Sequence, residues 1–467
     1  MDTSEPQATD PIGGSAAPAI AWARAACHRA VPALVAVARG HLTLAALGDP
    51  TPTTALLTQV GRLIGRPFGT PVPLAMPGRD PGAAGDLLTS TPGLDTLFEV
   101  LPETDPARPL LVFHAAGPDA STETLTQAPK TLLAGRRAVV VHPPPARGDS
   151  LEAVTLTLLQ AGLIGLPVAT SLHGGRADPL ALLDRLAATI HGFYIENAWT
   201  RGEALGSTPA LRPWEQLPET YRDSNRAQAD HLFLKLETAG LIARPQTRSG
   251  DDEAVSAPAW SQPARIERLA ILEHDRWASD RLLDGWMPGP VRDNARKVHP
   301  DLLPYEALSE DVKEKDRVAV LTVPLILRLA GLAYRPVQTA RLRGPWPWGD
   351  ATPGRIQQRR LLRLAAAAAS ERAPMALEYV AAIDDPGACA AALILARAGV
   401  PVALAGAGLE SPSGSDPAHR RRLAALIPMC RRVSPAVAWM PEETPLVATW
   451  HPRIGLTVDR LSSEAEG

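Results

Sequence analysis

The stretch LEHDRWASDRLLDGWMPGPVRDNARKVHPDLLPYEALSEDVKEKDR, residues 272–317, decides how the middle of this chain folds. Its first part has the charged faces of a helix and ends at Gly285-Trp286, where the glycine favours termination. A loop with several Pro, Gly and basic residues follows, and the last part returns to a helical pattern. The stretch therefore predicts two helices joined by a long basic loop.

A weaker form of the same pattern lies upstream, within residues 184–245. The two forms align at an offset of 83 residues in the first helix and 91 residues afterwards, so one eight-residue insertion within 290–299 separates them. Agreement with a single gap indicates an internal duplication. The matching upstream residues are His191, Tyr194, Gly202 and Gly206 at the first offset, and Pro209, Leu211, Pro213, Trp214, Leu217, Asn225, Arg226 and 239–241 at the second.

The downstream form resembles the RyR repeat of ryanodine receptors in its His-x-x-Trp, Gly-Trp, Gly-Pro-x-Arg-Asp, His-Pro and Leu-x-Pro-Tyr elements. The upstream form resembles a degenerate copy, because it keeps Pro-x-Leu-x-Pro-Trp but lacks the Gly-Trp pair and the basic loop. In the channels, paired copies resemble a pseudo-symmetric clamp that can hold an adenine nucleotide. In bacterial proteins the repeats are often fused to Rossmann-like domains and have been proposed to sense nucleotides. The resemblance therefore implies an intracellular binding module.

Both flanks of this module alternate short apolar runs with helical segments, which is typical of parallel α/β layers. A helix–Ala-Gly–strand phrase occurs in each flank, as QAGLIGLPVAT and RAGVPVALAG. This pattern leaves open two Rossmann-like domains or one domain interrupted by the repeats. The expected strands are 110–114, 138–142 and 167–170 in the first flank and 377–383, 400–405, 437–440 and 446–450 in the second, with helices at 151–163 and 387–398.

The expected fold class is α/β flanks with a parallel sheet around a central, mainly α-helical tandem RyR module. The first residues are polar, small and rich in Pro and Gly, which is typical of a disordered segment. The expected divisions are a disordered tail at 1–19, an N-terminal Rossmann-like domain at 20–183, the degenerate repeat at 184–245, a linker at 246–263, the second repeat at 264–336 and a C-terminal Rossmann-like domain at 337–467.

The composition narrows the function classes. A net charge of −3 gives no basic footprint for nucleic acid. No apolar run reaches the ~18–20 residues that cross a bilayer, and the acidic N-terminus does not match a signal peptide. The three cysteines, Cys27, Cys389 and Cys430, have no metal-ligand spacing and suit a reducing compartment. We expect a cytoplasmic protein with no membrane or nucleic-acid partner, and the Ala, Arg and Pro richness is typical of a bacterial coding sequence rich in GC.

The candidate ligand-binding residues of the second copy combine flat aromatic faces with cations. Indole rings can stack a base for ~1–3 kcal/mol per base. The adjacent loop supplies guanidinium groups, which bind phosphate through bidentate, charge-assisted bonds. Each residue alone also fits a packing, turn, ion-pair or capping role, and only the constellation favours a ligand. The set is Trp277, Trp286, Arg292, Asp293, Arg296, Lys297, His299, Tyr305 and Arg317.

The first copy differs at the aromatic positions, because Tyr194 replaces Trp277 and Glu203 replaces the indole of Trp286. Two equivalent sites are therefore not expected. We expect one ligand between the copies, an adenine nucleotide or an ADP-ribose-like molecule, with most contacts from the second copy. The first-copy candidates are Tyr194, Trp214, Arg222, Asn225 and Arg226.

Motifs for catalysis or metal binding are weak, and no catalytic or metal-ligating residue is assigned. The Gly406–Gly408 and 174–176 turns lack a full glycine fingerprint. His114 and His142 end two expected strands, where open α/β sheets place ligands. Asp384-Asp385 follows another strand and could bind a ribose or a metal, although the pattern favours a plain loop role at each of these sites.

Three functions compete. The first is a ligand-sensing protein whose repeats bind a nucleotide or a nucleotide-derived messenger, in bacterial stress or anti-phage signalling. The second is a nucleotide-processing enzyme with its chemistry in a flank and the repeats as regulator. The third is a structural scaffold. The expected partners are a small nucleotide-like molecule and either a homo-oligomer or a partner protein.

Overall fold

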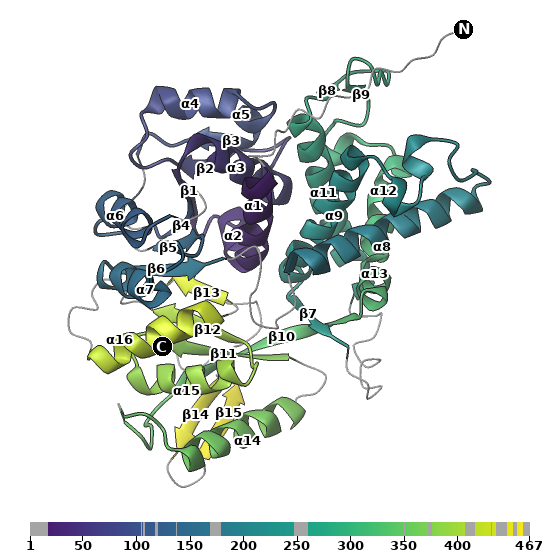
Figure 1. Cartoon of the computed structure of the whole chain (residues 1–467). Coiled ribbons are helices and arrows are strands. Elements are labelled where there is room, and N and C mark those ends of the chain that lie inside the picture. Colours follow the sequence, from purple (N-terminus) through teal and green to yellow (C-terminus); the bar gives the residue numbers. More distant parts are fainter. Residues whose placement is uncertain are drawn as a thin grey trace.

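The computed structural model describes residues 17–103, 105, 108–116, 120–136, 138–168, 179–246, 260–349, 351–371, 376–406, 416–430, 432–435, 446–451 and 455–460 (Figure 1). Two sheets with their helices and one helical module make up these residues. The expected strand 437–440, the turn 174–176 and residues 407–408 lie outside the described residues, as do most of the tail and most of the linker.

The first sheet has six parallel strands in the order β3-β2-β1-β4-β5-β6. Alternate residues of β4 face opposite sides, so Leu111 and Phe113 join the core under α1–α3 while Val112 joins the core under α6 and α7. The strands are β1 Thr43–Gly48, β2 Val72–Ala75, β3 Phe98–Val100, β4 Leu110–Ala115, β5 Ala138–His142 and β6 Leu163–Pro167. The helices are α1 Ala17–Arg29, α2 Val31–Ala38, α3 Pro50–Ile64, α4 Pro81–Thr89, α5 Leu94–Leu97, α6 Thr122–Leu132 and α7 Leu151–Gln160.

The apolar runs 110–114 and 138–142 are confirmed as strands β4 and β5. The third expected strand, 167–170, begins earlier than predicted, as β6 Leu163–Pro167, and residues 169–170 lie outside the described residues. Helix α7 ends at Gln160, and Gly162 turns the chain with a φ of 77°, so pairing with β5 starts at Leu163. Helix α7 and the turn after it end earlier than the apolar pattern indicated, because Gly162 terminates the helix.

The second sheet has the order β13-β12-β11-β10-β14-β15, and β15 runs antiparallel to β14 while the other neighbours are parallel. The expected strands 377–383, 400–405 and 446–450 and the helix 387–398 are confirmed to within two residues. The strands are β10 Leu332–Arg343, β11 Ala376–Ala382, β12 Val402–Gly406, β13 Arg432–Pro435, β14 Leu446–His451 and β15 Gly455–Arg460. The helices are α14 Arg355–Glu371, α15 Pro386–Arg397 and α16 Pro417–Leu426, followed by the turn η6 Ile427–Met429.

The helical module lies between the two sheets in the sequence and has two halves, each with a long helix, a 3-10 turn, further helix and a strand, in that order. The first half comprises α8 Pro179–Thr200, η1 Pro209–Leu211, η2 Trp214–Gln216, α9 Glu219–Thr238 and β7 Leu241–Pro245. The second comprises α11 Pro263–Leu283, β8 Met287–Pro288, β9 Val298–His299, η4 Tyr305–Ala307, α12 Glu310–Leu321 and α13 Val323–Leu329, and it leads into β10.

Strand pairing joins the two halves about a central residue pair. Strand β7 lies antiparallel to the first part of β10, and Ala243 pairs with Tyr334, the residue 91 positions later. The pairs on either side exchange equivalent positions, as a two-fold relation requires. The second part of β10 then pairs with β11 and β14, so one strand belongs to both the helical module and the second sheet.

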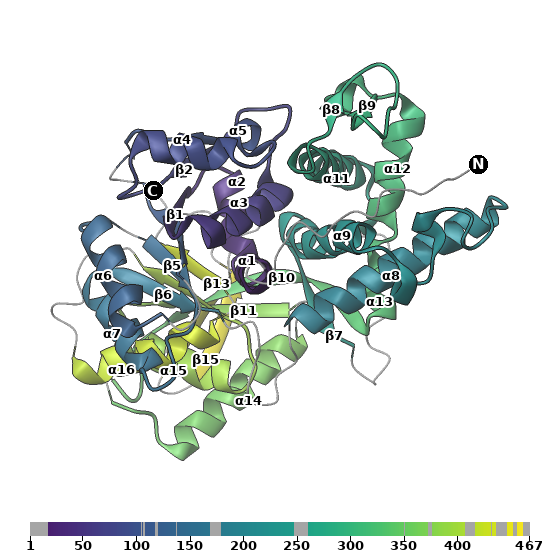
Figure 2. The same cartoon turned by 45° about the horizontal axis from the view of Figure 1, so that its top comes forward.

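The helical module lies beside the first sheet's helices in both views (Figures 1 and 2). Helix α3 contacts α11 and α9, and helix α1 contacts α8. The two sheets also touch, because α16 packs on α7 and η6 on β6. The candidate residues of the module are therefore placed against the first flank and not in isolation.

Candidate ligand site in the helical module

A column of aromatic rings surrounds the first candidate residues. Phe68, from the loop after α3, stacks on His274 at 5.9 Å, and His274 stacks on Trp277 at 5.5 Å. His299 makes T-shaped contacts with both indoles, with ring centres 4.9 Å from Trp277 and 5.9 Å from Trp286. Trp286 and His299 are only 9% and 8% exposed. The two indoles therefore pack against other rings, and neither offers two open faces for a base.

The polar atoms of this column have defined partners. The Nδ1 atom of His299 accepts a hydrogen bond from the Asp301 amide at 3.1 Å, which leaves the proton on Nε2. Burial lowers the pKa of His299, so the ring is neutral at pH 7. Trp286 donates to Asp284 at 2.9 Å, and the Arg281 guanidinium lies 5.5 Å from the indole centre. A neutral imidazole N–H donor thus lies between two indoles.

The basic loop between β8 and β9 has a defined shape. Asp293 and Val298 exchange backbone hydrogen bonds at 3.0 and 2.8 Å, and the Asp293 carboxylate accepts from the Arg296 amide. Lys297 has a φ of 52°, a conformation that non-glycine residues rarely adopt. Its ammonium group donates to the carbonyl and the carboxylate of Asp284. These contacts hold the loop in a single turn.

The guanidinium groups of Arg292 and Arg296 lie on the outside of this loop. The Arg292 side chain is exposed and donates to Asn294 within the loop at 2.9 Å. The Arg296 side chain is 84% exposed, and its nearest carboxylate, Asp293, is 3.8 Å away. Both groups therefore have donors available to a ligand.

Tyr305 and Arg317, by contrast, bind to their own module. The hydroxyl of Tyr305 donates to Glu267 at 3.1 Å, and burial together with that carboxylate raises the pKa of Tyr305 to about 12. Arg317 pairs with Glu267 at 2.8 Å and with Glu310 at 2.9 Å. These contacts tie α12 to α11.

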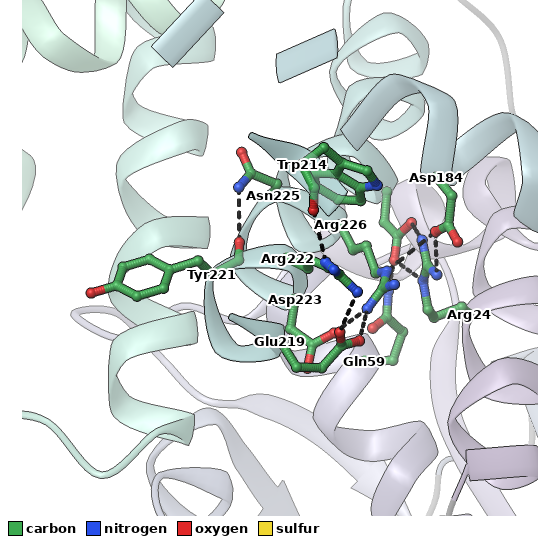
Figure 3. A network of polar contacts seen from close by, with 11 residues as sticks. Arg24, Gln59, Asp184, Trp214, Glu219, Tyr221, Arg222, Asp223, Asn225 and Arg226 are labelled. Atoms are coloured by element: carbon green, nitrogen blue, oxygen red, sulfur yellow. Dashed lines mark hydrogen bonds and ion pairs between the residues drawn. The ribbon is translucent and has the colours of Figure 1, made fainter. Parts of the chain in front are cut away.

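The first-half candidates make equivalent internal contacts (Figure 3). Arg226 pairs with Glu219 and, at 3.3 Å, with Asp184. Arg222 donates to the Trp214 carbonyl at 3.1 Å. Asn225 donates to the Tyr221 carbonyl at 2.8 Å.

The two halves share these contacts position by position. His191 bonds the Arg212 carbonyl at 2.7 Å, and His274 bonds the Leu303 carbonyl at 2.8 Å. The rings beside each histidine are Tyr194 and Trp214 in the first half and Trp277 and Tyr305 in the second. The ion pairs Asp184–Arg226–Glu219 and Glu267–Arg317–Glu310 also fall at the offsets of 83 and 91. The matched positions therefore build the same local structure twice.

Among the described residues, the hydrogen bonds, ion pairs and ring contacts given above for the candidates stay within their own half of the module. Arg226 shares Asp184 with Arg24 of α1 (Figure 3). Arg24 pairs in turn with Asp230, so the middle of α9 faces the first flank. The β8–β9 loop and the loop after α8 lie apart in both views (Figures 1 and 2). The reason is the two-fold arrangement, which places equivalent loops at separate ends of the module.

A buried charge cluster joins α9 to α11, and the sequence reasoning missed it. Lys235 lies 2.5 Å from Glu273, and Arg276 donates to the same carboxylate at 2.8 and 3.0 Å. Burial alone would raise the pKa of Glu273, but Arg276 and Lys235 outweigh it and hold the pKa well below its usual range. No pattern signalled the cluster, since charges at helical spacing normally mark a solvated face.

The weaker sequence candidates are also built into the fold. His114 and His142 end β4 and β5 but are buried, and burial lowers the pKa of each to about 4. Asp385 caps α15, accepting from the amides of Gly387 and Ala388 at 2.8 and 2.9 Å. The Trp346 indole donates to the other oxygen of Asp385 at 3.0 Å. These groups are therefore committed to structure.

Within the described residues, no three His, Cys, Asp or Glu side chains gather as a metal site. No described helix combines the length and the apolar character needed to cross a membrane. Among known protein families, the model described as the RyR domain matches residues 254–332, the segment that carries α11, the basic loop, α12 and α13. This part of the chain is thus an RyR domain.

Proposed function

We propose that the protein is a ligand sensor whose RyR domain binds a nucleotide or a nucleotide-derived messenger at the β8–β9 loop. The phosphates would contact Arg292 and Arg296 on the outside of the loop. The base would lie against the partly exposed Trp277 and the Nε2–H group of His299. This places the ligand on one half of the module and not between the halves.

The observation that carries the proposal is a contrast among the basic candidates. Arg222, Arg226 and Arg317 are held by carboxylates or carbonyls of the module. Arg292 and Arg296 point outward from a loop that is itself fixed by backbone bonds. A preformed loop with exposed guanidinium groups suits the bidentate recognition of phosphate, because little ordering entropy is lost on binding.

We further propose that residues 179–246 are a degenerate second RyR copy and that the flanks are Rossmann-like domains. The paired contacts at two constant offsets support the first statement. The strand order 3-2-1-4-5-6 of the first sheet, which is the order of doubly wound nucleotide-binding folds, supports the second.

The helix beginnings in both flanks favour placing the ligand in the RyR domain. Doubly wound folds bind pyrophosphate on free amides at a helix N-terminus. Helix α3 begins Asp49-Pro50-Thr51-Pro52, so two early positions have no amide donor and a carboxylate lies beside them. The first amides of α15 are taken by Asp385. Neither helix is well equipped for a phosphate.

Thermal unfolding of the full chain with ADP, ATP and ADP-ribose tests the proposal. A ligand that binds only the native state at 100 times its Kd stabilises by about 2.7 kcal/mol. We expect at least one of the three to raise the Tm, and the Arg292→Ala/Arg296→Ala variant to lose that rise.

The matched control is Arg201→Ala/Arg212→Ala, which removes two exposed positive charges from the loop after α8. It should keep the ligand-induced rise. If both variants lost the ligand-induced rise in Tm equally, net charge alone would explain the effect. If the Arg292/Arg296 variant kept the full rise, the β8–β9 loop would not be part of the site.

A further inference from the structure

A cavity of about 230 Å³ opens in the first flank, away from the RyR domain. It lies among the loop after β2, the loop after β3, the start of β4 and the end of α6. Its lining residues are Ala75, Met76, Pro77, Gly78, Arg79, Pro81, Ala84, Val100, Leu101, Pro102, Glu103, Leu110, Leu132, Leu133 and Arg136. This volume is below the ~300 Å³ that begins the usual range of ligand pockets, so it suits a small molecule.

The cavity has a topological cause. The chain crosses from β3 at the sheet edge to β4 beside β1, and the described residues of this link form no helix. Such a link in a parallel sheet is usually helical and covers one face. Ala75 and Leu110 belong to the apolar face under α6 and α7, and no helix in the described part of this link covers that face.

The inner wall of the cavity consists of apolar side chains that are buried and closely packed. Met76, Leu110 and Leu133 are buried, with exposures of 6%, 1% and 1%. Leu132 is 39% exposed and lies against Gly78, where a Cβ atom would come within 2.8 Å of the leucine. Gly78 and Leu132 together thus narrow the opening. A hydrocarbon body would gain roughly 25 cal/mol for each Å² of apolar surface buried here.

One cation of the lining has no carboxylate partner. Arg79 donates to the Gly48 carbonyl at 2.8 Å, and among the described residues it forms no ion pair. A carbonyl anchor orients the guanidinium without neutralising its charge, which is the state that favours an incoming anion. Arg136, on another wall, donates to the carbonyl of Asp105 at 2.7 Å.

We propose that this cavity binds a small amphipathic monocarboxylate. The carboxylate pairs with Arg79, and the apolar body lies against Met76, Leu110 and Leu133. Glu103, also in the lining, disfavours ligands that carry two negative charges. The site is independent of the proposed nucleotide site, because it lies on a different domain face and shares no residue with the β8–β9 loop.

Calorimetric titration of the full chain with benzoate and octanoate tests this site, with benzamide and octanamide as uncharged isosteres and phenyl phosphate as the dianion. We expect a carboxylate to bind more tightly than its amide and than phenyl phosphate. Arg79→Met keeps the length of the side chain but removes the charge, and it should weaken carboxylate binding at least about tenfold while leaving amide binding unchanged.

Two further variants separate the site from general effects. Arg147→Met removes an exposed arginine of the same domain and should change nothing. Leu132→Trp should block the opening and weaken acid and amide alike. The proposal fails if wild type binds neither carboxylate, if amide or phenyl phosphate binds as well, or if Arg79→Met or Leu132→Trp binds like wild type. Nucleotide-induced stabilisation in Arg79→Met should remain, so failure here and failure of the RyR site are distinguishable.

Discussion

Glu273 lies among three basic side chains inside the molecule, and all four groups are buried. It contacts Lys235 and Arg276 directly, and His231 Nδ1 is 3.8 Å away. Burial first, and then the charge of Lys235, lower the pKa of His231, so the histidine is neutral and the carboxylate offsets two cations. A buried ion pair contributes little relative to an apolar core, but breaking one leaves an uncompensated charge.

We therefore expect Glu273→Gln to destabilise the protein by about 3–5 kcal/mol, measured as the change in free energy of unfolding by urea. Glu267→Gln is the control, because Glu267 is 43% exposed and Arg317 keeps Glu310 as a partner. The control should cost ~1 kcal/mol or less. Equal costs would mean that the buried cluster is not the reason.

Asp275 gives the protein a pH dependence opposite to that of most carboxylates. Burial, helped by Glu306 and Asp316 and opposed by His274 and Arg66, raises the pKa of Asp275 to about 6 from an ordinary value of 3.8. The folded state therefore favours the protonated acid. This contribution is fully present below pH 3.8 and is lost as the pH rises through 6.

Asp275→Asn should raise the free energy of unfolding at pH 7.5, by at most about 2–3 kcal/mol, and should change it little at pH 4. Urea titrations of both proteins at several pH values measure the difference. A gain that is the same at pH 4 and pH 7.5 would show that proton binding at Asp275 is not its cause.

At the junction of β1 and β4, the two backbones leave no room for a side chain at Gly48. Gly48 ends β1 with a φ of 116°, and a Cβ atom there would lie 2.3 Å from the Ala115 carbonyl oxygen. Neither backbone can yield without breaking the pairing of Gly48 with Ala115. Gly85, within α4, has an ordinary φ and no atom within 4 Å of its added Cβ.

Alanine at the two positions should act in opposite directions. Gly48→Ala should cost on the order of 3 kcal/mol, because strain and a backbone clash coincide. Gly85→Ala should stabilise by about 0.5–1 kcal/mol, because alanine suits a helix interior. Thermal or urea unfolding checks both, and a harmless Gly48→Ala would contradict the strand geometry.

Across the whole molecule, Arg24 connects the first flank to the helical module. Its guanidinium holds Asp230 of α9 through two bonds, at 2.8 and 2.9 Å, and Asp184 of α8 at 3.0 Å. Gln59 of α3 donates to the same Asp230 at 2.7 Å (Figure 3). The Asp230 side chain is 5% exposed and the Asp184 side chain is 44% exposed. The Arg24–Asp230 pair is therefore shielded from water, and the Arg24–Asp184 pair is not.

Double-mutant cycles should distinguish the buried Arg24–Asp230 pair from the exposed Arg24–Asp184 pair. The coupling free energy of Arg24→Ala with Asp230→Ala should be about 3 kcal/mol, and with Asp184→Ala below ~1 kcal/mol, since water screens the exposed pair. Arg39→Ala, at an exposed arginine nearby, should change stability by less than ~0.5 kcal/mol. Comparable coupling free energies in both cycles would overturn the distinction between the buried and the exposed pair.

The strands and the matching contacts of the two halves could be predicted because their signals are local. LLVFH and AVVVH are apolar runs bounded by polar residues, and both became central strands. The two offsets of the repeat likewise appear as paired histidine–carbonyl bonds. The order of the strands and the cavity over β1–β2 could not be predicted, because they depend on crossovers between distant segments.

The candidate site also has one part that could be predicted from the sequence and one part that could not. The exposed basic loop with Arg292 and Arg296 is local and could be read from its Pro, Gly and charge pattern. The status of Tyr305 and Arg317 depends on Glu267, which lies 38 and 50 residues earlier in the chain. Phe68 closes one end of the aromatic column, and Glu267 binds both Tyr305 and Arg317.

The sequence by itself determined the RyR domain and the principal strands, since periodicity and turn residues act over short distances. Only the tertiary structure decided which charges are buried and which arginines remain available. Burial is set by what packs from elsewhere, so Lys235 and Arg292, both basic residues in polar surroundings of sequence, end in opposite environments.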